Sequence, residues 1–424
     1  MMEIRHTVTS KLPFSLLILT AVVTAVATFV EAHYGTAYAR QHIYGAWWFI
    51  ALWGVTALAG CWLLYKKKVW RCLPVFLLHV SFVLILLGAF ITHVTSRSGM
   101  THLREGEVTC TYWVKNEQGA YVKSEMLPFY LALRDFRILY DADGVTPSDY
   151  VSQVVVSTKK GKEKATISMN KIGRVEGYRI YQTSFDEDER GSVFTISYDP
   201  WGTGITYAGY LLLAFSMLMK RSQESRVESQ ESRVKSQERN VLDLQKNTQG
   251  EKLSSLPSPL SALDSRLLTL PSPLSPLHPE ILLSLCGTAM ASYMVIAICQ
   301  SPLLPVLRSP FLFVHVGTIM LSYILLVTSI VRRKVLRPAV FLLAVGIFLG
   351  AVWANVSWGT YWSWDPKESW ALVTLLIYSL PLHEKSLPWF RSTRNYRIYS
   401  ILALASLLMT YFGVNFLGGM HSYQ

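Results

Sequence analysis

Nine apolar runs, each near the length that crosses a lipid bilayer, constrain this chain more than any other feature. A hydrocarbon core about 30 Å thick is crossed by roughly 20 apolar residues in a helix. The run at 281–300 is diluted by Ser284, Ser292 and Gln300, which makes it the weakest of the set. We therefore predict a polytopic α-helical membrane protein with about nine spans, near residues 12–30, 45–65, 73–95, 202–219, 281–300, 311–331, 338–357, 367–383 and 398–417.

The basic residues give this topology a direction. Residues 96–199 and 220–280 are nearly neutral, so the net charge of +12 comes from short segments between apolar runs. If the chain alternates through nine spans, almost all of these Lys and Arg residues fall on one side, and only Arg40, Arg308 and Lys367 fall on the other. Basic loops stay in the cytoplasm, so we expect the N-terminus on the inside and the C-terminus on the outside of the membrane. This charge distribution excludes nucleic-acid binding, and lipid is the expected surrounding.

The first run is too long for the apolar part of a secretory signal and is followed closely by a second span, so we expect an uncleaved anchor. Residues 96–199 then form one external domain. Alternating stretches rich in β-branched and aromatic residues predict that this domain is mostly β. The clearest stretches are Val154–Thr158, Lys164–Ser168, Tyr178–Gln182 and Val193–Tyr198.

Residues 222–279 differ from everything around them. Ser-Gln-Glu-Ser-Arg-Val at 222–227 recurs with one substitution at 229–234, and Leu-Pro-Ser-Pro-Leu at 256–260 recurs at 270–274. Low-complexity sequence has little apolar surface to offset the entropy of ordering, so we expect a cytoplasmic linker. The chain then divides into a four-span half with the external β domain at 1–220, a linker at 221–280 and a five-span half at 281–424.

Five tryptophans crowd into eighteen residues on the outer side, between the seventh and eighth predicted spans. An interfacial aromatic belt is the simpler interpretation, although a belt normally places one or two aromatics at each helix end. A cluster of indoles facing water also suits a large planar apolar ligand with a polar edge, and haem fits that description. The next residues have a structural interpretation that is compatible with either, because Asp365, Pro366 and Glu368 form a helix start with a capping box. The five are Trp353, Trp358, Trp362, Trp364 and Trp370.

Four histidines form two pairs, one on each side of the predicted membrane. His315 lies near the outer end of the sixth span, and His421 follows the ninth. His79 lies near the inner end of the third span, and His383 closes the eighth. Ionisable residues in spans are functional candidates, although a single histidine can simply bond to a neighbouring helix. Two facing imidazoles would hold haem iron axially. His33, His42 and His93 have outer positions that suit belt residues.

The segment Trp358–Trp370, WGTYWSWDPKESW, resembles the tryptophan-rich haem-handling signature of the CcsA/ResC proteins of system II cytochrome c biogenesis. PFLFVH at 310–315 and GGMHSY at 418–423 resemble the two external haem-ligating histidine motifs of that family, and YSLPLH at 378–383 resembles its inner histidine. The first half resembles the partner family CcsB/ResB, through LLHVS at 77–81, GYRIYQ at 177–182 and DPWG at 199–202.

The resemblance implies a fused cytochrome c synthase, that is, a haem lyase. Haem b, bound as substrate, would pass from His79 and His383 to an outer site with His315, His421 and the tryptophans, beside Asp365. There the thiols of an apocytochrome c Cys-x-x-Cys-His motif would add to the haem vinyl groups. The synthase then supplies orientation and no protein nucleophile. We also consider a thioredoxin-like partner that reduces these thiols.

Two other functions remain open at the level of sequence. A haem exporter or chaperone would pass haem to a separate ligase, but it would have no need of the fused β domain. A b-type dihaem electron-transfer protein would carry four histidines on facing helices, whereas His421 lies in a short tail beyond its span. The chain has no Cys-x-x-Cys-His motif, so it is not itself a c-type cytochrome.

Overall fold

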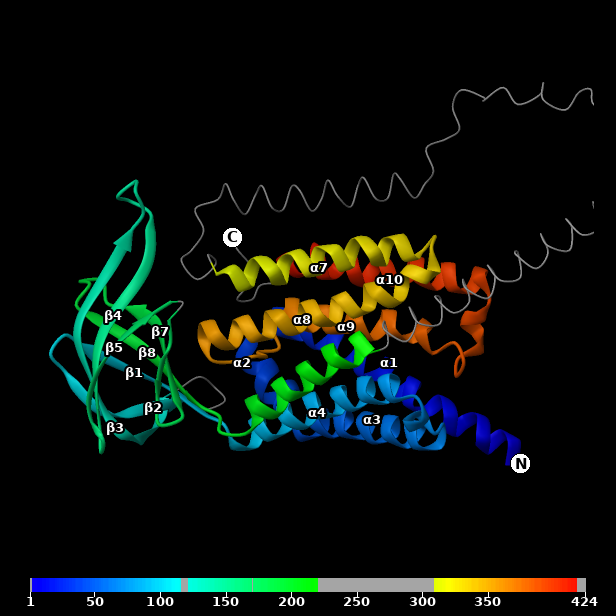
Figure 1. The fold of residues 1–424 in the computed structure, drawn as a ribbon, viewed down its shortest axis with the longest axis horizontal. Helices are drawn as coiled ribbons and strands as arrows, with labels where there is room; N and C mark the ends of the chain where they lie inside the picture. The colour runs from blue at the N-terminus through cyan, green and yellow to red at the C-terminus, as the bar shows by residue number, and fades with distance from the viewer. Residues whose placement is uncertain (1, 116–120, 170, 220–308, 418–424) are drawn as a thin grey trace, which may run out of the picture.

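A bundle of long helices carries a β domain at one end (Figure 1). The computed structural model describes residues 2–115, 121–169, 171–219 and 309–417. We call the end of the bundle next to the β domain the domain end, and the opposite end, where the N-terminus lies, the far end (Figure 1).

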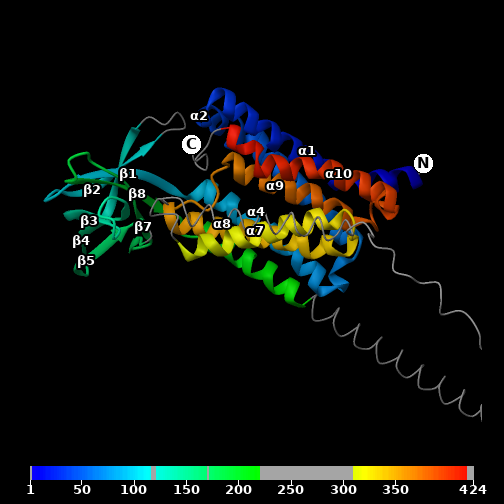
Figure 2. The ribbon, with the colours of Figure 1, turned by 90° about the horizontal axis from the view of Figure 1, so that it is seen from above.

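The first half supplies α1 (Met2–Tyr34), α3, α4 and a further long helix that follows the β domain. Between α1 and α3, a short helix α2 and a π-helical turn η1 make the connection at the domain end (Figures 1 and 2). The remaining bounds are α2 Thr36–Ala39, η1 Arg40–Tyr44, α3 Trp47–Lys66, η2 Val69–Arg71, α4 Leu73–Thr95 and the last helix Gly202–Met219.

The second half supplies four helices that lie beside those of the first (Figure 2). They are α7 Pro310–Ser329, α8 Leu336–Trp358, α9 Pro366–Ser379 and α10 Thr393–Tyr411. Short 3₁₀ turns complete the half at η4 Arg333–Val335, η5 Leu380–His383, η6 Pro388–Arg391 and η7 Gly413–Phe416. The turns that join α3 to α4, α7 to α8 and α9 to α10 all lie at the far end (Figure 1), and they carry the basic residues predicted to be cytoplasmic.

Six helices are long and apolar enough to cross a membrane among the residues that the structure describes. They correspond to six of the nine predicted runs, so a membrane protein with several spanning helices is confirmed. The total of nine is not. The run at 281–300 lies outside the described residues. The run at 367–383 is a 14-residue helix, α9, shorter than the roughly 20 residues that a straight crossing takes. The 19-residue α10 begins with polar and basic residues, including Arg394 and Arg397.

The domain between α4 and the helix Gly202–Met219 is mostly β, as predicted. Eight antiparallel strands form one sheet in the order β5-β4-β3-β2-β1-β8-β7-β6. The ends of this sheet approach each other, since Gly173 of β6 lies against Ile167 of β5, so the domain is nearly a barrel. Its strands are β1 Arg97–Arg104, β2 Val108–Lys115, β3 Tyr121–Tyr140, β4 Pro147–Thr158, β5 Gly161–Ser168, β6 Gly173–Val175, β7 Tyr178–Phe185 and β8 Gly191–Tyr198.

The chain leaves the domain through a capped helix. The Asp199 carboxylate accepts hydrogen bonds from the backbone N–H of Gly202 (2.9 Å) and Thr203 (2.8 Å), which satisfies donors that a helix start leaves free. It also accepts a bond from the Thr92 hydroxyl of α4 (2.8 Å). The two helices then pack so closely that a Cβ at Gly88 would lie 2.3 Å from the Thr206 hydroxyl. Small residues at helix contacts are typical of membrane bundles.

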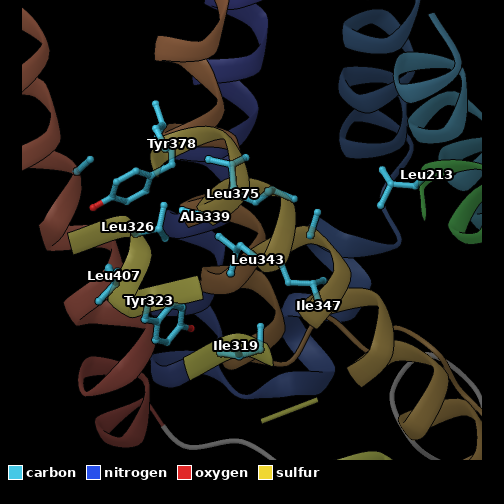
Figure 3. Packing of buried hydrophobic residues seen from close by; sticks show 14 of the residues in the cluster. Leu213, Ile319, Tyr323, Leu326, Ala339, Leu343, Ile347, Leu375, Tyr378 and Leu407 are labelled. Carbon is cyan, nitrogen blue, oxygen red and sulfur yellow. The ribbon is translucent and has the colours of Figure 1, made fainter. Parts of the chain in front are cut away.

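The bundle has one principal apolar core, and both halves of the chain contribute to it. Leu343 and Ile347 of α8 lie at its centre, between Ile319 of α7 and Leu375 of α9 (Figure 3). Leu213, from the helix Gly202–Met219, belongs to the same cluster. Since this core contains side chains of both halves, the two halves pack against each other.

Candidate functional site

The structure brings His79 and His383 together at the far end. The imidazole of His79 comes from α4 and that of His383 from η5, and their ring centroids are 6.0 Å apart at an angle of 74°. Phe14 of α1 packs edge-on against His383, with ring centroids 5.3 Å apart. This pair of predicted site residues therefore lies at a contact between the two halves of the chain.

All three described candidate histidines bond a backbone carbonyl through Nδ1. The distances are 2.7 Å from His79 to Val75 O, 3.0 Å from His383 to Ser379 O and 2.7 Å from His315 to Gly346 O. In each case Nδ1 is the donor, which fixes the tautomer and leaves Nε2 as the basic nitrogen. Histidines that ligate a metal are commonly held in this way. The same bond occurs from His42 to Tyr38 O (3.1 Å), so the bond alone does not identify a ligand.

His315 lies in the half of α7 that is nearer the domain end, and its imidazole packs against α8 at Gly350. A Cβ at Gly350 would lie 2.6 Å from His315 Cε1, so the imidazole rests where only a glycine leaves room. The carbonyl that His315 bonds belongs to Gly346, one turn earlier on the same helix. Its predicted partner His421 lies outside the described residues, so that pair has no geometry here.

The tryptophan segment, residues 358–370, runs from the end of α8 into α9. None of its indoles is exposed, and Trp353, which precedes it, is buried, so the expectation of indoles facing water needs correction. Trp353 and Trp358 meet edge to face with centroids 4.7 Å apart, and Trp362 and Trp364 do so at 5.8 Å and 88°. Trp370 Nε1 donates to the Thr28 hydroxyl of α1 (3.0 Å). The indoles pack into the surrounding helices.

The β domain holds the first part of this segment. The Tyr181 hydroxyl donates to Asn355 O (3.0 Å), and Arg179 donates to Asn355 Oδ1 (2.8 Å). Burial raises the pKa of Tyr181 to about 12, so its hydroxyl remains a donor at neutral pH. Gly359 ends α8 with φ +88°, and a Cβ there would lie 2.6 Å from Tyr181 Cε2. Strand β7 therefore fits against the end of α8, and GYRIYQ at 177–182 is the sequence that makes the contact.

The middle and end of the segment contact the first half as well. The buried Tyr361 hydroxyl donates to the Thr92 hydroxyl of α4 (2.9 Å). The Trp364 ring stacks on Tyr44 of η1, with centroids 5.2 Å apart and planes within 6°, and packs edge-on against Phe49. Sequence reasoning missed Tyr44, Phe49 and Asn355, and it noted Tyr181 only as part of the motif GYRIYQ. No local pattern connects these residues with residues 358–370.

The predicted helix start after the tryptophans is confirmed. Asp365 is the N-cap of α9, its Oδ1 accepts the Lys367 N–H (2.9 Å), and Pro366 is the first helical residue. Glu368 lies in the first turn of α9, at the position that the capping box requires. Its Oε2 accepts the N–H of Ser363 (2.8 Å), two residues before the cap residue, so the carboxylate also fixes the loop between Trp362 and Trp364.

The fold and site together describe a polytopic membrane protein whose two halves meet at a histidine pair and around a tryptophan-rich loop. Family models match both halves: the ResB-like family over residues 56–211 and the cytochrome C assembly protein family over residues 328–421. The first match contains His79 and the β domain, and the second contains the tryptophan segment, His383 and His421. His315 lies outside both. The chain therefore joins a ResB-like region to a cytochrome C assembly region, which is the fusion that the resemblance to system II cytochrome c biogenesis proteins predicted.

Individual relatives match shorter stretches. The chain is 51% identical over 83 residues to protein NrfI of Wolinella succinogenes, covering 19% of this chain and 9% of that protein. It is 44% identical over 91 residues to the cytochrome c biogenesis protein CcsA of Oenothera argillicola and 45% identical to that of Oryza sativa. Each CcsA match covers 21% of this chain and 28% of the relative. The chain therefore matches well under two thirds of the length of these curated relatives.

Proposed function

We propose that this protein is a cytochrome c synthase, which takes up haem b at the far end and supports its covalent attachment to apocytochrome c at the domain end. The observation that carries the proposal is the meeting of His79 and His383 across the two halves. A haem site built from both halves gives a reason for joining a ResB-like part to an assembly part in one chain. The family matches support the role in cytochrome c biogenesis.

At the far end, we propose that His79 and His383 bind incoming haem through Nε2. Their Nδ1 bonds to helix carbonyls orient both rings before haem arrives, so less freedom is lost on binding. The basic turns around this end suit the cytoplasmic side of a membrane. We accordingly propose a cytoplasmic N-terminus, a periplasmic β domain and a bacterial inner membrane.

At the domain end, we propose that His315 and His421 hold haem while Trp358, Trp362, Trp364, Trp370 and Asp365 build its surroundings. In the reaction, each thiol of Cys-x-x-Cys-His adds to one vinyl group. A sulfur–carbon bond forms, the thiol proton goes to the other vinyl carbon, and nothing is oxidised or reduced. The protein therefore needs no nucleophile of its own. It must hold the haem face and edge in one orientation, and the clients' thiols must arrive reduced, which is the task of a thioredoxin-like partner.

We also propose the division of the chain into a ResB-like half (1–220), a linker (221–280) and an assembly half (281–424). The shared core around Leu213 and Leu343 supports a working unit made of both halves, whatever joins them. Shortening the linker by about forty residues should then leave attachment nearly intact.

The test is co-expression with a Cys-x-x-Cys-His reporter in cells without another maturation system, scored for covalent haem. His315→Ala should abolish attachment and open an axial position in the bound haem, and added imidazole should partly restore both. His42→Ala is the control, since it has the same Nδ1 bond without the proposed role. Haem bound by the protein with no covalent product in any condition would favour an exporter or a b-type electron carrier.

A further inference from the structure

The Trp364 indole lies inside an aromatic enclosure that comes from the first half of the chain. Tyr44 stacks on one face, Phe49 contacts it edge-on at 5.2 Å and 76°, and Trp53 lies at 6.3 Å and 45°. We call Tyr44, Phe49 and Trp53 the Trp364 cage. All three precede Trp364 by more than 300 residues, in the connection between the first two spans and at the start of α3. Trp362 closes the enclosure at a right angle, with centroids 5.8 Å apart.

The backbone at Trp364 needs such support. Trp364 has φ +62°, a left-handed conformation that is costly for a bulky side chain. Conformations of this kind persist where the surroundings determine them, and they gather at functional sites. The left-handed residue Trp364 lies directly before Asp365, the N-cap of α9. The contacts of the indole with the rings of the cage therefore help to hold the backbone in this conformation.

Tyr44 is itself held in place by a contact with α1. It ends the π-helical turn η1, an unusual element that often marks a functional position. Its hydroxyl donates to Glu31 Oε2 of α1 (3.3 Å), and both side chains are buried. Burial, first, and the neighbouring Glu31 carboxylate, second, raise the pKa of Tyr44, so the hydroxyl stays a donor. Two residues of α1 about one turn apart, Glu31 and Thr28, thus support the segment, because Thr28 accepts the bond from Trp370.

We propose that the Trp364 cage is a positioning device by which the first half of the chain sets the tryptophan segment. On this proposal Trp364 acts indirectly: it packs against Trp362 and holds that ring in position, and haem does not stack on Trp364 itself. Trp362 is half-buried and packs between Trp364 and the principal core, so a shift of Trp364 must move it. This inference rests on the proposed function for its haem readout, but its first step concerns the loop alone.

The first arm of the test therefore uses the full-length protein without haem. Amide hydrogen exchange at residues 359–365 is compared between wild type, Tyr44→Leu and Tyr44→Phe. Leu removes the stacked ring and should raise exchange in the loop by tenfold or more, while Phe keeps the ring and should stay within about threefold of wild type. Tyr38→Leu is the control, since Tyr38 is exposed and stacks on His42 instead. Unchanged exchange in Tyr44→Leu would overturn the proposal, whether or not the protein attaches haem.

The second arm uses haem-loaded protein and reads the absorption spectrum, the reduction potential and the rate of attachment to the reporter. Tyr44→Leu should shift the potential and lower the rate several-fold at equal protein level, with Phe restoring both. If Tyr44→Leu fails to insert, Phe49→Leu and Trp364→Phe give the same comparison with part of the enclosure retained. A normal potential and rate despite a loosened loop would show that the cage only packs the protein, and would overturn the proposal. Absence of attachment in wild type would refute the proposed function and leave the first arm standing.

Discussion

The two ends of the bundle build their candidate sites in different ways. At the far end, two imidazoles from α4 and η5 meet directly, and each is oriented by a carbonyl of its own helix. At the domain end, a loop of seven residues between α8 and α9 is held by β7, by α4 and by the Trp364 cage. The far end is therefore a site of few parts on rigid elements, and the domain end is a loop whose shape depends on distant contacts.

The two sites should therefore be sensitive to different substitutions. A helix holds a side chain in place through its own backbone, so the far end should fail only when a ligand is removed or two helices separate. The loop at the domain end carries a left-handed tryptophan and a glycine that no other residue can replace without strain. The loop should therefore respond to substitutions of residues that do not contact a haem-ligating histidine.

Removing the far-end ligands should have the largest effect. In His79→Ala and His383→Ala, and most clearly in the double variant, haem per protein should fall by roughly tenfold or more. Loss of a partner that merely orients a ligand typically costs about 10–100-fold, and loss of the ligand should cost no less. Haem is measured by pyridine haemochrome on purified protein, with His42→Ala as the control. Normal loading in the double variant would mean that this pair does not receive haem.

Displacing His315, the proposed haem ligand at the domain end, should have the next largest effect. In Gly350→Ala the new methyl group would lie 2.6 Å from His315 Cε1, so the imidazole must move away from α8. We expect a mixed-spin spectrum and a several-fold loss of attachment, partly reversed by imidazole. Gly317→Ala on α7 is the matched control, since its methyl group would meet no atom within 4 Å. Equal behaviour of the two variants would remove His315 from the proposed ligand set.

The contact of Tyr181 with Gly359 can be tested separately from the backbone strain that any side chain would cause at Gly359. Gly359 and Gly106 have nearly the same φ, +88° and +87°, so alanine at either should cost about 1–2 kcal/mol in the left-handed region. Only at Gly359 would the methyl group also meet Tyr181. Both variants should therefore melt at a lower temperature, while Gly359→Ala alone should lower attachment to the reporter. A similar loss in Gly106→Ala would attribute the effect to stability.

The smallest effect should concern the stability of the β domain alone, and it should depend on pH. The Tyr112 hydroxyl, first, and Lys123, second, hold the pKa of Glu125 below its usual range. A lowered carboxyl pKa stabilises the folded state above its unfolded value near 4.5 and loses that contribution as pH falls through the folded value. Glu125→Gln should therefore lower the free energy of unfolding at pH 7 by less than about 1 kcal/mol, seen as a slightly lower melting temperature, and this difference should shrink as the pH falls below 4.5. Haem loading at both ends should not change.

Much of the architecture could be predicted from sequence because its signals are local. Six of the predicted runs became membrane-length helices, and the cap at Asp365 and Pro366 formed as expected. The four stretches taken as strands lie within β4, β5, β7 and β8, while the other four strands of the sheet were not singled out. Those include β3, whose 20 residues contain Pro128 and two shifts of register against β4 that obscure the alternating pattern.

Most of the helices and half of the strands could be predicted from the sequence, because they depend on periods of two to four residues and on the thickness of a bilayer. The contacts of His79 with His383, of Tyr181 with Gly359 and of Trp364 with rings of the first half appear only in the folded structure. Such contacts join residues more than 170 positions apart. They follow from how helices of both halves share one core, and no repeat along the chain records that arrangement.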